Sequence, residues 1–311
     1  MHDVIGTYER LRRVYRLYVE SAFPLRSEAL TVERDELLAR RGTPTDPGTL
    51  AQPPVLETVP VYNRTTLTLQ QLSQQLVTQH GLDPAYADLQ FLGQELFNPG
   101  DRLYDHQVQS LEAVLARRQD LVVTTGTGSG KTECFLLPLL AEIARESATW
   151  PACPPPPNPA ARRWWEQGNQ RCGQWAHSAR EHALRAVVLY PLNALVEDQL
   201  RRLRRTVDSP AVHNWLDTNR ERNRILFGRY TGSTPVPGDP TRGAAVNRLR
   251  GRLTDMSQEY ADIMLRMQDT ALSQAERAEI AREVRYYFQN PDGGEMWSRW
   301  DMQETPPDIL I

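Results

Sequence analysis

The stretch LVVTTGTGSGKTECF runs from Leu121 to Phe135 and contains Lys131, which is the only lysine of the chain. Every other residue among the 36 lysines and arginines is an arginine. Residues 121–124 form a short apolar, β-branched run of the kind that makes a buried parallel strand. A helical pattern follows from Thr132 to Glu146. The glycines therefore stand between an expected strand and an expected helix.

The glycine-rich segment has the composition of a phosphate-binding loop. Its members are Thr125, Gly126, Thr127, Gly128, Ser129, Gly130, Lys131 and Thr132. The glycines allow a tight turn that points backbone N–H groups at phosphate oxygens, and the following helix adds its positive end. The Lys131 ammonium can reach the β- and γ-phosphates, and the Thr132 hydroxyl can ligate Mg²⁺, so both are predicted catalytic residues. The alternative is an ordinary Gly/Ser turn, and the strand–loop–helix context favours nucleotide binding over it.

Arginine could not replace Lys131 in such a loop. Its guanidinium is longer, planar and forked, whereas a narrow ring of backbone N–H groups suits a compact ammonium. One lysine placed at random among the cationic positions would rarely fall here. The single lysine therefore supports a phosphate-binding function.

Further short apolar runs at residues 186–190, 225–227 and 309–311 are expected to be strands. Helices are expected around Val108–Leu115, Leu195–Leu203, Leu253–Gln268 and Ser273–Gln289. Strands that alternate with helices indicate an α/β fold with a mainly parallel sheet.

Residues 1–100 are expected to form a helical N-terminal region. A helix is predicted from Leu69 to about His80, capped by Thr68, and residues 43–60 are expected to be a linker or surface loop. Near the N-terminus, apolar and aromatic residues recur at helical spacing and would line one helix face. This face is better explained as part of the core or as a docking surface than as a cofactor-binding site. Its members are Val4, Tyr8, Leu11, Tyr15 and Tyr18.

Composition limits the possible function classes. The net charge is −3, so no general basic field attracts nucleic acid, and any such partner must be held by local patches. The apolar runs are shorter than the ~18 residues that cross a bilayer. The first twenty residues lack the apolar core of a secretory signal, and the three cysteines lack paired spacing. We expect a soluble, cytoplasmic protein with no membrane partner.

Four further segments stand in a fixed order around the loop: LYDHQ (103–107), YPLNALVEDQ (190–199), GRYTGSTP (228–235) and PPDILI (306–311). With them, the chain from Leu103 to Ile311 resembles the first RecA-like domain of a superfamily 2 DEAD/DEAH-type helicase. Within that superfamily it is similar to the large bacterial helicases of the Lhr and MrfA groups, including those of Druantia and DISARM phage-defence systems. Thr125 stands where stricter phosphate loops have glycine, a position that is looser in helicases.

The resemblance implies roles for individual residues. Gln107 would read adenine, with Tyr104 stacking nearby. The residues implied to contact nucleic acid are Pro191, Asn193, Gln199, Arg202, Thr231 and Gly232. Arg202 belongs to a cluster with Arg201, Arg204 and Arg205, which is either a solvated helix face or a set of phosphate contacts.

The departures from the family concern catalysis. The sequence contains no D-E-x-[HD], the acidic motif that would hold Mg²⁺ and position water. The expected layout is therefore a helical region at 1–100 and a first motor domain at 101–311, truncated before that motif and interrupted by insertions at about 149–184 and 240–300. Such a chain would bind ATP and hydrolyse it poorly or not at all.

Two functions remain open. One is the ATP-binding portion of a helicase, for which DNA is favoured over RNA as the nucleic acid. Its protein partner would be the missing second half of the motor or another defence-system subunit. The other is a non-catalytic ATP-binding module that docks a partner.

The first insertion also leaves alternatives. Its ArgArgTrpTrp group at 162–165 could stack bases or, as we favour, pack against the domain. A zinc site from Cys153, Cys172, His177 and His182 is disfavoured by the lack of a C-x₂₋₄-C pair.

Overall fold

A computed structural model describes residues 3–43, 45–52, 54, 61–98, 100–126, 128–156, 162–166, 170–236 and 242–311. The chain divides into two compact units, Met1–Val61 and Tyr62–Ile311, and each is described by itself. None of the described helices combines the length and the apolar character needed to cross a lipid bilayer.

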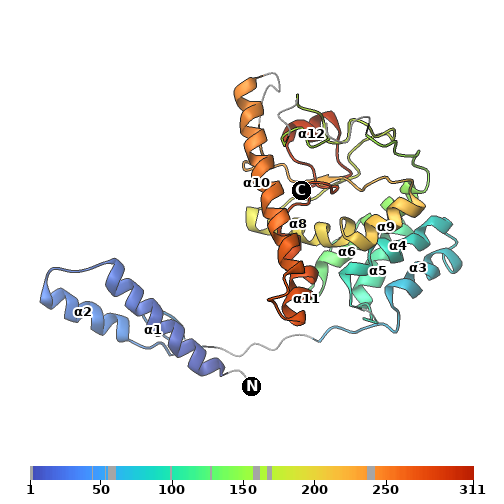
Figure 1. The fold of residues 1–311 in the computed structure, drawn as a ribbon. Coiled ribbons are helices and arrows are strands. Elements are labelled where there is room, and N and C mark those ends of the chain that lie inside the picture. The colour runs from blue at the N-terminus through green and yellow to red at the C-terminus, as the bar shows by residue number, and fades with distance from the viewer. Residues whose placement is uncertain are drawn as a thin grey trace. The chain divides into compact units, whose positions relative to one another are not determined.

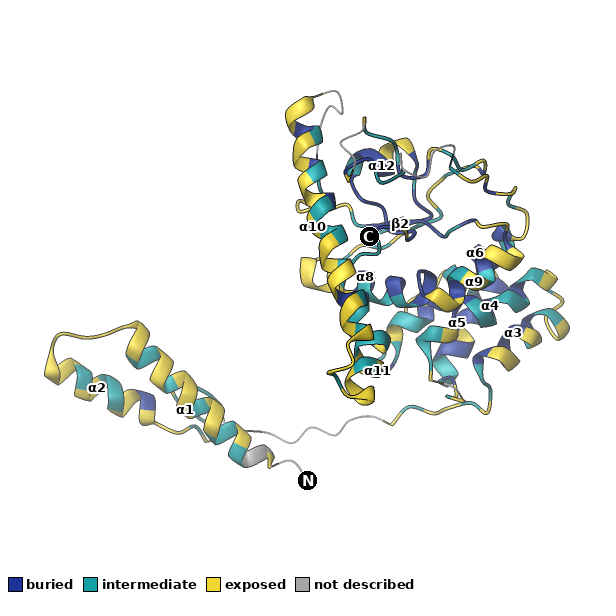
Figure 2. Cartoon of the chain, in the orientation of Figure 1, coloured by how far each residue is buried: buried dark blue, intermediate teal, exposed yellow. Residues whose placement is uncertain are grey.

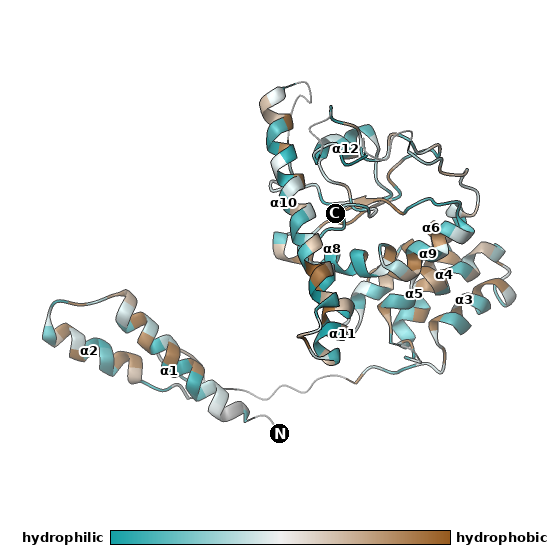
Figure 3. Ribbon diagram, in the orientation of Figure 1, coloured by the Kyte–Doolittle hydropathy of each residue, from teal (hydrophilic) through white to brown (hydrophobic). Residues whose placement is uncertain are grey.

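The first unit is a hairpin of two helices, α1 (Val4–Ala22) and α2 (Glu28–Ala39) (Figure 1). Polar contacts join them: Arg12 donates to the carbonyl of Ala39 at 2.7 Å, and Arg41 pairs with Glu9 at 3.0 Å. Among its described residues only Leu38 is a buried hydrophobic residue, whereas Leu11 is 65% exposed. Helices α1 and α2 thus carry apolar residues on exposed surface (Figures 2 and 3). The apolar and aromatic face predicted on the first helix is not the core of this unit.

The second unit contains the remaining elements. In chain order they are α3 (Leu69–Thr78), the 3₁₀ helix η1 (Pro84–Asp88), α4 (Leu89–Leu92), η2 (Gln94–Leu96), α5 (Asp105–Leu115), α6 (Lys131–Ser147), β1 (Ala186–Val187), α8 (Asn193–Val207), α9 (Pro210–Asn219), β2 (Phe227–Gly228), α10 (Gly243–Gln268), α11 (Gln274–Arg282), η3 (Val284–Tyr287), α12 (Arg299–Glu304) and β3 (Ile309–Leu310). The predicted helix α3 is confirmed. Thr68 and Gln71 form a reciprocal capping box at its start.

The three strands form a parallel sheet in the order β1-β3-β2, which confirms the α/β prediction. Ile309 aligns with Ala186 on one side and Phe227 on the other. Ile309 and Phe227 pack into the core shared with helices α3–α6, α8 and α9, whereas Leu226 and Leu310 face a second cluster. Helices therefore cover one face of the sheet, and a smaller cluster with Cys153, Trp175, Met296 and Met302 of α12 covers the other (Figure 1).

The strand predicted at 121–124 is wrong for the described structure. The segment has no ladder partner among the described residues, and Val122 is 87% exposed. A strand needs a neighbour for its backbone N–H and C=O groups, so an apolar β-branched run stays outside the sheet when no strand lies beside it. The strand predicted at 186–190 is likewise confined to Ala186–Val187. Helix α10 begins ten residues before the predicted Leu253, at Gly243, and α9 was not predicted.

A buried ion pair fixes the central strand. Arg180 makes two hydrogen bonds to Asp308, of 2.8 and 2.6 Å, and their side chains are 1% and 0% exposed. Asp308 also accepts the backbone N–H of Leu226 at 2.7 Å. The guanidinium of Arg180 lies 3.9 Å from the ring centroid of Trp150. The segment that contains Arg180 is thereby anchored to the residue that precedes β3.

The tryptophans of the first insertion pack inside the unit, which confirms the packing interpretation. Trp164 and Trp165 are 1% and 3% exposed and join Trp297 and Trp300 in one apolar cluster. The rings of Trp165 and Trp297 meet edge to face at 4.6 Å. Within the ranges that the structure describes, no three potential metal ligands gather, so the zinc alternative gains no support.

His182 in the same insertion makes stability depend on pH. Burial and then the nearby Arg180 and Arg185 lower the pKa of His182 from 6.5 to about 4, and neither ring nitrogen has a hydrogen-bond partner among the described residues. Between pH 6.5 and about 4 the unfolded chain binds a proton here that the folded chain does not, so stability falls as pH falls.

We therefore expect His182→Gln to remove part of this pH dependence. Between pH 7 and pH 5 the melting temperature of wild type should fall by about 4–8 °C more than that of the variant, which corresponds to ~2 kcal/mol for a domain of this size. Thermal unfolding of both proteins at pH 8, 7, 6 and 5 tests this. Parallel curves would contradict the assignment, and the offset at pH 8 serves as the control for any packing change.

Candidate functional site

The glycine loop leads directly into α6 and has the backbone that the sequence predicts. Gly130 is the N-cap of α6 with φ of 76°, and Gly128 has φ of 73°. Both values lie in the left-handed region that favours glycine. A Cβ on Gly130 would also lie 2.3 Å from the amide nitrogen of Gln107. Glycine at 130 is thus favoured by its conformation, and a Cβ there would require the Gln107 side chain to shift.

Inside the loop, Lys131 is folded back onto the segment that it follows. Its Nζ donates to the carbonyl of Thr125 at 2.6 Å, and the hydroxyl of Ser129 donates to that of Thr125 at 2.7 Å. The Thr132 hydroxyl has no hydrogen-bond partner in the described part of the chain and is available to a cation. Thr127 lies outside the described residues. An ammonium and a free hydroxyl at the start of a helix are the groups that ATP with Mg²⁺ requires.

Side chains from the start of α5 support the loop. His106 Nε2 lies 2.7 Å from the carbonyl oxygen of Ser129, and it must carry the proton because that oxygen only accepts. Gln107 donates to the carbonyl of Gly130 at 3.2 Å and accepts the backbone N–H of Tyr104 at 2.9 Å. Both ends of this 2%-exposed amide are therefore engaged. The predicted adenine contacts of Gln107 and Tyr104 stay predictions.

Sequence reasoning missed two residues at this site, His106 and Tyr62. The backbone N–H of Gly126 donates to the Tyr62 hydroxyl at 2.8 Å, across 64 residues of sequence. The position of His106 beside Gln107 could have indicated its role. Nothing in the sequence pointed to Tyr62, because its contact is set by the fold.

The predicted nucleic-acid residues flank the sheet at one edge. Asn193 opens α8 after β1, and Thr231 and Gly232 follow β2. Because β1 and β2 both run parallel to β3 in register, the segments that follow them leave the same edge of the sheet. Pro191, Asn193 and Gly232 are exposed, Thr231 is half-buried, and Gln199 is only 6% exposed. An ion pair between Arg229 and Glu197 ties the end of β2 to α8.

The arginines of α8 divide between two environments. Arg204 is buried and binds both carboxylate oxygens of Glu295, at 2.5 and 2.9 Å. Arg202 is 37% exposed and contacts Glu133 of α6 at 3.0 Å and Asp198 at 3.1 Å. Arg204 is therefore structural, whereas Arg202 joins α8 to the first turn after the phosphate loop.

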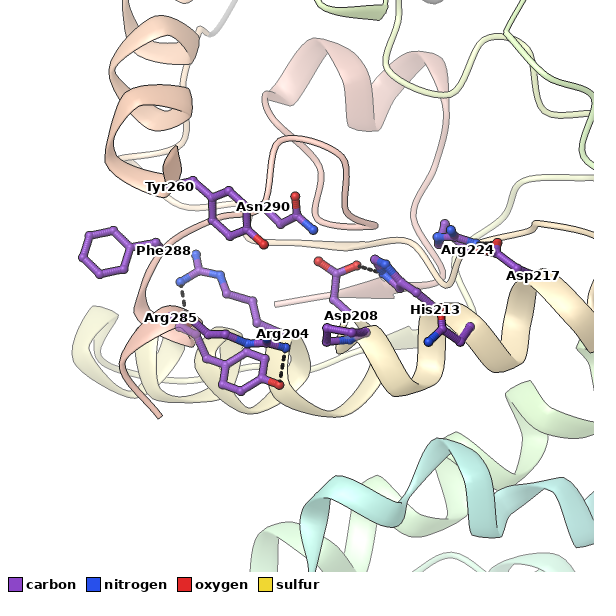
Figure 4. Close-up of a pocket in the computed structure, with 12 residues that line it drawn as sticks. Arg204, Asp208, His213, Asp217, Arg224, Tyr260, Arg285, Phe288 and Asn290 are labelled. Carbon is purple, nitrogen blue, oxygen red and sulfur yellow. Dashed lines mark hydrogen bonds and ion pairs between the residues drawn. The ribbon is translucent and has the colours of Figure 1, made fainter. Parts of the chain in front are cut away.

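A cavity of about 270 Å³ lies apart from the loop, and no loop residue lines it (Figure 4). Asp208 at the end of α8 points toward His213 there, with 2.7 Å between Oδ1 and Nε2, and also accepts the backbone N–H of Gly294 at 2.7 Å. A Cβ on Gly293 would lie 2.1 Å from Asp208 Oδ2. These contacts fix the α8–α9 junction onto the segment before α12.

Two features define the site: the segments that leave one edge of the sheet, and a glycine loop that is supported by other side chains and followed by a lysine and a hydroxyl at the start of a helix. Together they define a P-loop nucleotide-binding protein. Residues 104–234 match the family of DEAD/DEAH box helicases, and the chain carries a helicase domain of this superfamily 2 family. The α/β fold with its preceding helices agrees with a RecA-like helicase domain, as the resemblance implied. Proteins of this family generally use ATP and Mg²⁺.

The chain is also similar to a much longer protein. It is 34% identical over 243 residues to Druantia protein DruE of Escherichia coli (strain UMEA 4076-1). The match includes 76% of this chain and 11% of that relative. No solved structure matches the chain.

Proposed function

We propose that the chain is the ATP-binding N-terminal portion of a DNA-directed superfamily 2 helicase or translocase that acts in phage defence. The observation that carries the proposal is the phosphate loop at 125–132 with its single lysine, held by His106, Gln107 and Tyr62, together with the segment YPLNALVEDQ (190–199) that follows β1. The similarity to a Druantia protein supports the defence setting. The exposed Pro191 and Asn193 support nucleic-acid contact.

ATP with Mg²⁺ fits the residues present. Lys131 would exchange the carbonyl of Thr125 for phosphate oxygens, and the unpartnered Thr132 hydroxyl would hold the cation. Bound Mg²⁺ neutralises phosphate charge. The N–H groups around Gly128 and Gly130 and the N-terminus of α6 would orient the phosphates.

Hydrolysis requires groups that this sequence does not contain. No D-E-x-[HD] occurs in residues 1–311, so the carboxylates that hold Mg²⁺ and position water would lie outside these residues. We infer that they belong to the second half of the motor, with which this portion would assemble. The absent motif equally motivates the second candidate, an ATP-binding module that docks a partner without catalysis.

The test is ATP hydrolysis by the purified chain with and without single-stranded DNA, beside equilibrium binding of a labelled, slowly hydrolysed ATP analogue. We expect binding that depends on Mg²⁺, with turnover no faster than that of the Lys131→Ala control. DNA-stimulated turnover would overturn the inferred need for the second half of the motor. An absence of nucleotide binding at millimolar concentration would overturn the proposed function itself. Unchanged binding of the analogue in the presence of DNA would favour the docking module over the motor.

A further inference from the structure

Tyr62 reaches the phosphate loop from far away in the sequence. It is the first residue of the second compact unit, and its hydroxyl accepts the backbone N–H of Gly126 at 2.8 Å. Gly126 is exposed and is the first glycine of the loop. In the described part of the chain this is the single side-chain contact made to a loop N–H from outside the loop.

The Tyr62 hydroxyl is held in place by its surroundings. Backbone bonds pair the next residues with the segment before α5: Asp105 donates to Asn63 at 3.1 Å, and Thr65 donates to Leu103 at 2.8 Å. The Tyr62 ring meets those of His106 and Tyr104 edge to face, at 5.5 and 6.1 Å. A rigid backbone and two ring contacts therefore fix the direction of the hydroxyl.

Tyr62 and His106 hold opposite ends of the loop. Tyr62 binds the N–H of Gly126, whereas His106 binds the carbonyl of Ser129. The rings of Tyr62 and His106 contact each other. Together the two side chains hold the loop at its first glycine, Gly126, and at Ser129, the residue before its last glycine. A glycine-rich loop has much conformational entropy to lose when it closes on phosphates. Anchors that hold it in one shape reduce that loss on binding.

We propose that Tyr62 is a positioning residue of the phosphate site, whose hydroxyl preorganises the loop for the phosphate chain of the nucleotide. The proposal rests on the function proposed above. Tyr62 acts through Gly126, so its effect concerns the phosphates and not the base. The hydroxyl hydrogen has no acceptor among the described residues, which leaves it available to a phosphate oxygen as well.

The experiment removes one oxygen atom. Tyr62→Phe keeps the ring contacts with His106 and Tyr104 and loses only the bond to Gly126. Tyr287→Phe is the matched control, because the Tyr287 hydroxyl accepts from Arg201 at 2.9 Å and does not contact the loop. Binding is measured for two probes, a slowly hydrolysed ATP analogue and inorganic tripolyphosphate, which has no base. Hydrogen exchange of the loop amides is measured in parallel.

We expect Tyr62→Phe to weaken both probes by about 5-fold, as the loss of one hydrogen bond does, and to speed exchange at Gly126. Tyr287→Phe should leave the binding of both probes unchanged. Weaker binding of the ATP analogue alone would mean that Tyr62 contacts the base, which overturns the proposal. Unchanged binding of both probes would also overturn it. So would a loss of binding accompanied by faster exchange throughout the unit, since that pattern reports a general loss of structure.

Failure of this proposal differs from failure of the proposed function. If Lys131→Ala abolishes binding while Tyr62→Phe leaves it intact, the site binds nucleotide and Tyr62 has no part in positioning the loop. If wild type binds neither probe, the proposed function fails and takes this inference with it.

Discussion

Lys131→Arg is expected to abolish binding of the ATP analogue as completely as Lys131→Ala, although it keeps the positive charge. The exposed ammonium lies 2.6 Å from the carbonyl of Thr125, where it closes the turn of the loop. A guanidinium is longer and planar and does not enter that space. We expect at least ~100-fold weaker binding for both variants, equivalent to ~2.7 kcal/mol. Equilibrium titration with a fluorescent analogue measures this.

Thr132 supplies the matched control for that experiment. Thr132→Ser keeps the hydroxyl and should bind within about 3-fold of wild type, whereas Thr132→Val should lose the increment that Mg²⁺ adds. Binding by Lys131→Arg at wild-type strength would show that only charge matters at this position. It would then leave the single lysine without a functional explanation.

Asp308→Asn is expected to cost about 3–5 kcal/mol of unfolding free energy, because it leaves a buried guanidinium without a counter-charge. Arg180 is 1% exposed, and Asp308 is the carboxylate that it binds with two hydrogen bonds. The same carboxylate accepts the N–H of Leu226 at the start of the sheet. The loss should appear as a large shift of the urea midpoint, with unfolding followed by circular dichroism.

The ion pair between Arg224 and Asp217 provides an exposed comparison. Its partners are 2.6 Å apart and 15% and 43% exposed, so Asp217→Asn should change stability by less than ~1 kcal/mol. Adding Arg180→Met to Asp308→Asn should recover part of the loss, since no unpaired charge then remains buried. Equal effects of Asp217→Asn and Asp308→Asn would contradict the structural role given to Asp308.

Local patterns predicted the elements that depend on nearby residues. The glycine loop, the Thr68 cap of α3 and the helix after Lys131 follow from spacing over a few positions. The segment at 121–124 failed because a strand is defined by its neighbour, and sequence alone does not show whether one is present. Tyr62 and the Arg180–Asp308 pair join residues 64 and 128 positions apart, which no local pattern reports.

The residues that the resemblance implies for nucleic-acid contact show that a position in a sequence motif does not establish surface exposure. Gln199 was assigned from its place in the motif, yet it lies on the buried face of α8 with Val196, Leu200 and Leu203. The helical spacing of those apolar residues already indicated that face. The arginine cluster could not be divided by spacing alone, because only the position of Glu295 shows that Arg204 is an internal residue.

Because Lys131 is the only lysine of the chain, lysine-specific reagents can be directed to the phosphate loop alone. A protease that cuts only after lysine has one target in this chain, the exposed Lys131 at the first turn of α6. An amine-selective reagent has the same target once the N-terminal amine, which has a lower pKa, has been blocked near neutral pH. Digestion or labelling of the unmodified chain therefore gives a one-site footprint of the loop, in which protection by a ligand would be read directly from two fragments.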